Sequence, residues 1–281
     1  MKILVTGVKG QLGSDVARFF VQKEHEVFGM SRDDMDITDS NQCHSVVTLL
    51  SPDVIIHCAA YTAVDKAEQD IVEAYRVNAD GTRNLAAIAE KMGIKFCYVS
   101  TDYVFDGTAT QPYHEYDNTN PVTIYGKSKR AGEILTQSLC SRYYIVRTSW
   151  VYGSNGNNFV KTMIKLGKEL NELKVVSDQV GSPTYTEDLA YFIEQLIGTD
   201  KYGIYHASNQ GQCSWYDFAC AIFEEKSINI TVHPCTTEEF PRPAPRPRFS
   251  VMEHMSIKSN NFVDLPPWRE SLVKFLGKYI D

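Results

Sequence analysis

A tyrosine and a lysine four residues apart, Tyr125 and Lys129, have the clearest potential for chemistry in this sequence. Four residues make about one helical turn, so a helix through this stretch would present the phenol and the ammonium on one face. A free phenol has a pKa of about 10, and a nearby cation favours the phenolate. Such a pair can give a proton to a ketone oxygen while a nicotinamide coenzyme gives hydride to the carbon. Chance supplies about one Tyr-x-x-x-Lys pair in a chain like this, so the motif needs support from its surroundings.

A hydroxyl group is predicted to reach the same place. The apolar run 95–100 predicts a strand, and Ser100, Thr101 and Asp102 stand at its carboxyl end. A threonine hydroxyl there can hydrogen-bond a substrate oxygen and orient it for reaction.

The N-terminal stretch predicts a binding site for a dinucleotide. Residues 2–6 form a short apolar run typical of a buried strand, and Gly7, Gly10 and Gly13 follow before a helical pattern begins. Glycines at a strand-to-helix turn let the backbone approach a pyrophosphate, which the positive helix start can hold. The alternative is a plain structural turn, because any tight turn of this kind favours glycine.

The end of the second predicted strand, 26–30, indicates which coenzyme is used. In many NAD-specific sites an acidic residue at this point binds the ribose hydroxyls. Here Ser31 and Arg32 follow Met30, and a hydroxyl with a guanidinium suits a 2′-phosphate better. The sequence therefore favours NADPH. The alternative is that Arg32 is merely a solvated loop residue.

Strands and helices alternate through residue 150, which predicts an α/β fold with a Rossmann-type, doubly wound parallel sheet. Ligands in such sheets lie beyond the carboxyl ends of the strands, so the segments 7–13, 59–62, 100–107 and 148–153 should converge on one crevice. We predict an NAD(P)-binding domain over 1–150 and a smaller α/β substrate lobe over 151–281, with chain crossings between the two. Further strands are predicted at 53–60, 143–148, 174–176 and 203–206, and helices at 65–92, 125–139, 158–170, 186–197, 215–225 and 268–279.

Composition excludes several classes of protein. The net charge of −7 disfavours nucleic-acid binding, which needs a basic face. No apolar run is long enough for a membrane span, and the N-terminal run ends at Gly7, too early for a signal peptide. Seven scattered cysteines without a Cys-x-x-Cys pair predict a reduced, cytoplasmic protein. The seven histidines show no ligand spacing, so no metal site is predicted from them.

The glycine pattern resembles the extended short-chain dehydrogenase/reductase superfamily, and motifs along nearly the whole chain resemble the dTDP-4-dehydrorhamnose reductase family. That family reduces the 4-keto group of dTDP-4-dehydro-L-rhamnose with NADPH or NADH, the last step toward dTDP-L-rhamnose for bacterial surface polysaccharides. The matching motifs are TGxxGxxG at 6–13, AAYTAVDKAE at 59–68, VNADGTRNLA at 77–86, STDYVFDG at 100–107, YGKSK at 125–129, RTSWVYG at 147–153, NNFVKTM at 157–163, DQVGSPT at 178–184 and the RP–S stretch at 246–250.

The resemblance implies roles for the residues of these motifs. Tyr125 would be the proton donor, Lys129 its tuner and a ribose ligand, and Thr101 the hydroxyl partner. Many relatives have histidine where this chain has Tyr61. The implied cofactor contacts are Gly10, Gln11 and Leu12 at the pyrophosphate, Asp36 and Ile37 near the adenine, and Ala59, Ala60 and Tyr61 near the nicotinamide.

The resemblance also implies a binding site for a sugar nucleotide. Asp102 and Trp150 would meet the sugar, and Arg246 its phosphates. Alternatively, Trp150 is ordinary core, and the proline-dense segment 241–247 is a surface loop for a partner. Asn78, a polar residue within an apolar helical stripe, either belongs to the site or is hydrogen-bonded to a neighbouring loop.

Some members of this family bind a divalent metal such as Mg²⁺ between subunits, through carboxylates near the positions of Asp15 and Glu187, and others do without it. Both alternatives stay open, as do a monomer and a homodimer.

Three rival functions are weighed against this interpretation. Sugar-nucleotide 4,6-dehydratases share the fold and Tyr-x-x-x-Lys but normally carry Thr-Asp-Glu, whereas this chain has Thr101, Asp102 and Tyr103. A reductase of another nucleotide-linked 4-keto sugar is a second candidate. A non-catalytic NADP-binding regulatory subunit, like the reductase-like partner of methionine adenosyltransferase, is the third, and the intact Thr101, Tyr125 and Lys129 argue against it.

Overall fold

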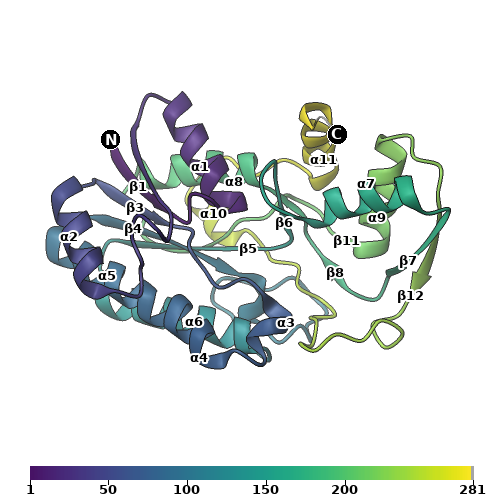
Figure 1. Cartoon of the computed structure of the whole chain (residues 1–281), viewed down its shortest axis with the longest axis horizontal. Coiled ribbons are helices and arrows are strands. Elements are labelled where there is room, and N and C mark those ends of the chain that lie inside the picture. Colours follow the sequence, from purple (N-terminus) through teal and green to yellow (C-terminus); the bar gives the residue numbers. More distant parts are fainter. Residues whose placement is uncertain (280–281) are drawn as a thin grey trace.

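The centre of the protein is a six-stranded, fully parallel sheet in the order β10-β5-β4-β3-β1-β2, seen in a computed structural model that describes residues 1–279 (Figure 1). The chain starts at β1, adds β2 on one side and then β3 on the other, so the sheet is doubly wound and its switch point lies between β1 and β3. This confirms the predicted fold class. The strands are β1 (Lys2–Thr6), β2 (Glu26–Met30), β3 (Val54–His57), β4 (Lys95–Thr101), β5 (Tyr143–Thr148) and β10 (Gly203–His206).

Two layers of helices cover the sheet, because alternate strand residues point to opposite faces. Ile3 and Val5 pack with α1 (Gln11–Gln22) and α8 (Thr186–Ile197), whereas Leu4 packs with α2 (Ser40–Leu50) and α5 (Thr82–Met92) on the other side. In Figure 1, α1 and α8 lie above the sheet, and α2, α5 and α6 (Ile124–Leu139) lie below it. Burial on both faces explains why these strands are almost continuous apolar runs.

The predicted helical stretch 65–92 is confirmed, but it is interrupted. It consists of α3 (Val64–Ala67), α4 (Ile71–Tyr75), a π-helical turn (Arg76–Gly81) and α5. Asn78 lies in the π turn, where its Oδ1 accepts from the Tyr61 N–H (2.8 Å) and its Nδ2 donates to the Tyr61 carbonyl (3.1 Å) and the Ser128 hydroxyl (2.9 Å). Asn78 therefore bonds to the neighbouring loop, as one of the two alternatives predicted.

Within the described residues, the second half of the chain forms three small two-stranded sheets and contributes β10 to the central six-stranded sheet. Its core is rich in aromatic side chains, including Tyr152, Tyr185, Phe218 and Phe275. The division at residue 150 stays a prediction, and α8, β10 and α10 (Met255–Ser259), all beyond that residue, pack with the first half. The remaining elements are β6 (Val151–Tyr152) with β9 (Thr184–Tyr185), β7 (Glu172–Val176) with β12 (Thr231–Cys235), β8 (Val180–Gly181) with β11 (Cys213–Ser214), and the helices α7 (Phe159–Glu169), α9 (Trp215–Glu225) and α11 (Trp268–Lys278).

All seven cysteines are free thiols, and five of them are buried. Within residues 1–279, no helix combines the length and the apolarity that crossing a bilayer would require.

Candidate active site

A cavity of about 1150 Å³ opens at the carboxyl ends of β1, β3, β4 and β5, at the switch point of the sheet. The four segments predicted to converge all contribute to its wall. Arg246 is the one predicted site residue that does not line it. The predicted residues that do are Gly7, Gly10, Gln11, Leu12, Gly13, Ser31, Arg32, Asp36, Ile37, Ala59, Ala60, Tyr61, Thr101, Asp102, Tyr125, Lys129 and Trp150.

The glycine turn forms one end of the cavity. Gly7 has φ +71°, and a Cβ there would lie 2.8 Å from the backbone of Ala59, so both conformation and space demand glycine. A side chain on Gly13 would collide with the carbonyl of Gly7. Helix α1 begins at Gln11, and within the described chain no side chain caps it. Its first N–H groups therefore suit an anion such as a pyrophosphate.

Directly after β2, the two residues predicted to bind a 2′-phosphate are both paired with carboxylates. The Ser31 N–H and hydroxyl both donate to Asp34, at 2.9 and 2.6 Å. The Arg32 side chain is 69% exposed and lies 3.6 Å from Asp36 and 4.0 Å from Glu73. Hydrogen bonds from Thr38, aided by Arg32 and Arg76, hold the pKa of Asp36 below its usual value despite its burial. A 2′-phosphate that bound Ser31 and Arg32 would therefore have to displace the carboxylates that now pair with these two residues.

Helix α6 carries the tyrosine and the lysine into the cavity. The Thr123 side chain caps this helix by accepting from the Gly126 N–H at 2.9 Å. Lys129, 2% exposed, donates from Nζ to the Val99 carbonyl at 2.7 Å and lies 4.1 Å from the centre of the Tyr98 ring. Burial lowers the pKa of Lys129 to about 7, against the opposing charge of Glu133.

In the free protein the Tyr125 phenol has a higher pKa than an ordinary phenol, whereas Lys129 and the nicotinamide charge together are expected to favour the phenolate. Burial raises the pKa of Tyr125 to about 12, while a hydrogen bond with Thr101 lowers it and the Asp102 charge raises it. Desolvation of the anion therefore outweighs any help from Lys129 in the free protein. The phenol stays protonated at neutral pH, which is the form that a proton donor needs.

Thr101 and Asp102 lie where β4 ends in a 3₁₀ turn (Asp102–Val104). The Thr101 hydroxyl donates to Asp102 Oδ1 at 3.0 Å and accepts from the Tyr103 N–H at 3.2 Å. Burial raises the pKa of Asp102 to about 6, although hydrogen bonds from its neighbours act in the opposite direction. A hydroxyl, a carboxyl and the Tyr125 phenol thus share one corner of the cavity.

Trp150 belongs both to the cavity wall and to the core of the second half. It follows β5 with φ +47°, a left-handed conformation that is uncommon for a bulky residue. Its indole stacks on Trp215, with centroids 3.5 Å apart and planes 7° from parallel. A Cβ on Gly181 would come within 2.6 Å of the same indole, so the ring lies directly against the backbone of β8. Trp215 does not line the cavity and was not predicted from the sequence.

Arg246 is held apart from the other predicted residues. Its guanidinium donates to Asp65 at 2.8 Å and to the Ala244 carbonyl at 2.9 Å. Asp65 belongs to α3, so this ion pair ties the proline-dense segment 241–247 to the helix beside the cavity.

Among the polar residues of the cavity wall that sequence reasoning missed are Lys66, Asp70 and Glu73. Asp70 accepts from the Tyr61 hydroxyl at 3.1 Å and lies 3.7 Å from Lys66. Their spacing of three to four residues, directly after the segment 59–62, was the available signal of one helical face.

The two carboxylates that the resemblance links to a metal have other partners. Asp15 accepts from Arg18 at 2.6 Å and from Thr186, and Glu187 pairs with Lys278 at 2.6 Å. No cluster of three or more candidate metal ligands occurs among residues 1–279.

Known proteins are similar to this chain along nearly its whole length. The model of the RmlD substrate binding domain matches residues 1–280. The chain is 44% identical to the spore coat polysaccharide biosynthesis protein SpsK of Bacillus subtilis (strain 168), over 98% of this chain and 96% of that one. It is 40% identical to a dTDP-4-dehydrorhamnose reductase of Aggregatibacter actinomycetemcomitans, over 96% and 97% of the two chains. A crystal structure of dTDP-4-dehydrorhamnose reductase from Bacillus anthracis str. Ames in complex with NADP superposes with a TM-score of 0.97, at 46% identity and 99% coverage of both chains.

Proposed function

The chain belongs to the dTDP-4-dehydrorhamnose reductase family and is an NAD(P)H-dependent oxidoreductase, and on this basis we propose that it reduces the 4-keto group of dTDP-4-dehydro-L-rhamnose with NADPH. The product is dTDP-L-rhamnose. The observation that carries the proposal is the meeting of Thr101, Tyr125 and Lys129 in one cavity whose other end is a glycine turn at a helix start.

The chemistry divides between the coenzyme and the side chains. The bound coenzyme supplies hydride to the keto carbon. Tyr125 donates its phenolic proton to the keto oxygen, so that one H⁻ and one H⁺ convert the ketone into an alcohol. The Thr101 hydroxyl holds that oxygen in line with the phenol. Lys129, as the ammonium, binds the coenzyme ribose and stabilises the phenolate that Tyr125 leaves behind.

NADPH is the proposed reductant, with NADH as a poorer substitute. The N-terminus of α1 and the turn 7–13 would hold the pyrophosphate. Arg32 would bind the 2′-phosphate after leaving Asp36 and Glu73, which lie at the long distances of 3.6 and 4.0 Å. The NADP complex of the similar Bacillus anthracis enzyme supports this choice.

The sugar nucleotide would enter from the side of Asp102 and Trp150. Trp150, held by its stack on Trp215 and by the close backbone of Gly181, would meet the sugar from the cavity wall. Arg246 would exchange Asp65 for the diphosphate, because a doubly charged anion offers a guanidinium more than one carboxylate does.

The deciding experiment is an assay of the purified chain with NADPH and dTDP-4-dehydro-L-rhamnose. We expect coenzyme oxidation that requires the sugar nucleotide and is nearly lost in Tyr125→Phe. Tyr103→Phe is the matched control, because this ring also lines the cavity, 5.5 Å from that of Tyr125. Faster turnover of a different nucleotide-linked 4-keto sugar would replace the proposed substrate. Tight NADPH binding without turnover of any keto-sugar nucleotide would favour a regulatory subunit instead.

A further inference from the structure

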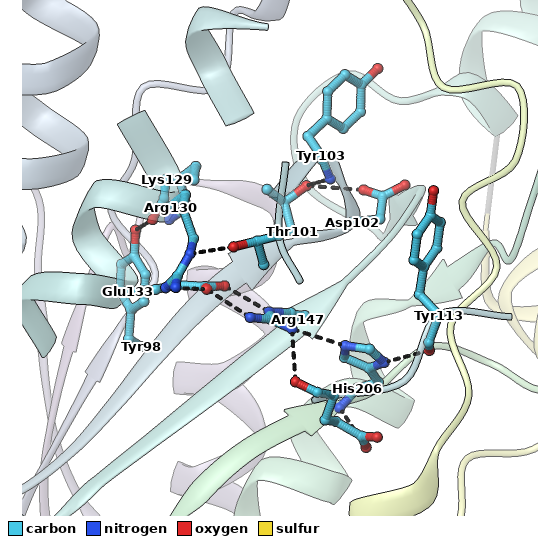
Figure 2. A network of polar contacts seen from close by, with 12 residues as sticks. Tyr98, Thr101, Asp102, Tyr103, Tyr113, Lys129, Arg130, Glu133, Arg147 and His206 are labelled. Carbon is cyan, nitrogen blue, oxygen red and sulfur yellow. Dashed lines mark hydrogen bonds and ion pairs between the residues drawn. The ribbon is translucent and has the colours of Figure 1, made fainter. Parts of the chain in front are cut away.

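A carboxylate and a guanidinium are completely buried beside the active-site helix, and the proposed mechanism uses neither. Glu133 lies one helical turn after Lys129 on α6, and Arg147 lies in β5. Arg147 Nε donates to Glu133 Oε1 and its Nη2 to Oε2, both at 2.9 Å, while the exposed fractions of the two side chains are 2% and 0%. Figure 2 shows this pair in the middle of a polar network that reaches from Arg130 to His206.

Stability is a weak explanation for such a pair. Removing two charges from water costs about as much as their attraction returns, and apolar residues of similar volume often replace a buried pair without loss. Loss of one partner alone is costly, because the other charge is left unpaired. A buried pair next to a proposed catalytic lysine therefore calls for a functional reason.

Arg147 is held on its other side by a neutral histidine. His206 Nδ1 lies 3.1 Å from the carbonyl oxygens of Tyr113 and Glu253, so it carries the proton, and Nε2 accepts from Arg147 at 3.3 Å. Burial and the charge of Arg147 keep the pKa of His206 well below its usual value. Figure 2 shows the ring joining Arg147 to Tyr113. The guanidinium is thus fixed from both sides and fixes Glu133 in turn.

Lys129 faces few other charges. On α6 its neighbours are Tyr125 and Glu133, and across from the helix are His57 and Cys58 at the end of β3 and Tyr98 of β4. At neutral pH His57 and Cys58 are uncharged, because burial lowers the pKa of His57 to about 3 and raises that of Cys58 to about 12. Glu133 is the one carboxylate among these groups, and its charge opposes the loss of the Lys129 proton.

We propose that Glu133, clamped by Arg147, is a positioning residue of the reductase: it supplies the negative charge that holds Lys129 as the ammonium and anchors α6 to β5. The inference rests on the proposed function, in which Lys129 acts only in its charged form. Arg130 Nη1 also donates to Glu133, at 3.2 Å (Figure 2), so the carboxylate has a fixed orientation. Arg130 is itself held by the hydrogen bond from its Nε to the Thr119 hydroxyl, at 2.6 Å.

The test compares the pH profile of kcat/KM for the wild type and Glu133→Gln. We expect the alkaline limb to move down by about one pH unit, so that activity at pH 8 falls about tenfold and recovers toward pH 6. A merely structural role would lower activity equally at every pH. Glu90→Gln is the matched control, because this exposed glutamate accepts from the Ser141 N–H at 2.8 Å, at the end of α6 and away from the cavity.

A second variant guards against misfolding, because Glu133→Gln leaves Arg147 without its bidentate carboxylate. Glu133→Gln/Arg147→Met removes both charges at similar volume and should fold. The alkaline limb of the double variant should also move to lower pH, but by less than in Glu133→Gln. The double variant loses the positive charge of Arg147, which is farther from Lys129, together with the nearer negative charge of Glu133. An alkaline limb at the wild-type pH in the folded variants would overturn the proposal.

A readout without turnover separates this inference from the proposed function. The ¹³Cε resonance of Lys129, assigned in lysine-labelled protein by its loss in Lys129→Met, should titrate at lower pH in Glu133→Gln than in the wild type. An equal midpoint in both would overturn the inference even in an active enzyme. An inactive wild type with the shifted midpoint would refute the proposed function, while the effect of Glu133 on the charge of Lys129 would still be established.

Discussion

The Lys129 ammonium donates a 2.7 Å hydrogen bond to the carbonyl of Val99, which lies two residues before Thr101 on β4. One bond thus ties the helix that carries the phenol to the strand that carries the hydroxyl. It also places a cation in an environment that burial makes unfavourable, so the charge state of Lys129 affects the folding equilibrium as well as the chemistry.

The first prediction concerns stability and pH. The pKa of Lys129 is lowered from its ordinary value of 10.5, which applies to the unfolded chain, to about 7 in the folded chain. Between these two pH values, Lys129 therefore binds more protons in the unfolded state than in the folded state. The contribution of Lys129 to the free energy of unfolding therefore rises with pH across this window, by at most about 1.4 kcal/mol per pH unit. Denaturant unfolding of wild type and Lys129→Met from pH 7 to 10 should show a stability difference that grows in favour of the wild type.

The exposed Lys127, two residues earlier on the same helix, provides the control variant. Lys127→Met should leave the pH dependence of unfolding as it is in the wild type. A constant difference between wild type and Lys129→Met across the window would contradict the depressed pKa of Lys129.

The second prediction separates orientation from binding. Thr101→Val keeps the shape of the side chain but removes the hydroxyl that would hold the keto oxygen. We expect kcat to fall about 10- to 100-fold, with a small change in KM, because the lost contact acts on the reacting atom. Ser100→Ala is the control, since its buried hydroxyl has no hydrogen-bond partner among the described residues. Equal losses in the two variants would argue against a special role for Thr101.

The third prediction uses the stacked indoles. A parallel pair with centroids 3.5 Å apart should give an exciton couplet in circular dichroism, and Trp215→Leu should abolish it. Since an aromatic pair contributes about 0.5–1.5 kcal/mol, we expect KM for the sugar nucleotide to rise about two- to tenfold, with kcat little changed. Trp268→Phe is the control, because this third tryptophan packs on Phe218 and takes no part in the stack of Trp150 on Trp215. An unchanged KM after loss of the couplet would make the stack purely structural.

Local patterns predicted the elements well. The bounds of β2, β5, β10 and α8 agree with the expected ranges, because apolar runs and helical periods reflect burial against near neighbours. The carboxyl ends of parallel strands must meet at one edge, so the crevice followed from the strand order. The strand expected over 53–60 was too long, since the small residues after His57 line the cavity instead of pairing.

Partners far apart in the chain were beyond the sequence. Arg246 meets Asp65 across 181 residues, and Arg147 lies in a recognised motif whose local pattern gives no sign of Glu133. The burial that raises the pKa of Tyr125 in the free protein was also beyond the sequence, which shows a neighbouring charge but not the desolvation of the phenol. Pairings and desolvation depend on the whole fold, which a local motif does not encode.

The fourth prediction concerns the anion site of the sugar nucleotide. Arg246→Ala should raise KM for the sugar nucleotide about 10- to 150-fold, since a hydrogen bond to a charged group contributes about 1.5–3 kcal/mol. Affinity for NADPH, measured by fluorescence titration, should stay unchanged. Arg248→Ala serves as control, because this arginine is 72% exposed and lies 3.8 Å from Glu238. A wild-type KM in Arg246→Ala would leave the Asp65 ion pair as a purely structural tie.

The last prediction concerns the choice between NADPH and NADH, which we expect to depend on the positive charge of Arg32 and the two carboxylates beside it. When no coenzyme is bound, Asp36 and Glu73 attract the Arg32 guanidinium. If Arg32 were absent, the same two carboxylates would repel the 2′-phosphate of NADPH. Arg32→Ala should therefore raise KM for NADPH about tenfold or more and leave KM for NADH nearly unchanged. The NADPH effect should shrink at high salt, because the site is exposed and screened. Arg83→Ala, an exposed arginine 3.7 Å from Asp80, is the control. If Arg32→Ala weakened both coenzymes alike, the residue would act on the shared part of the dinucleotide, and preference would have to arise elsewhere in the turn.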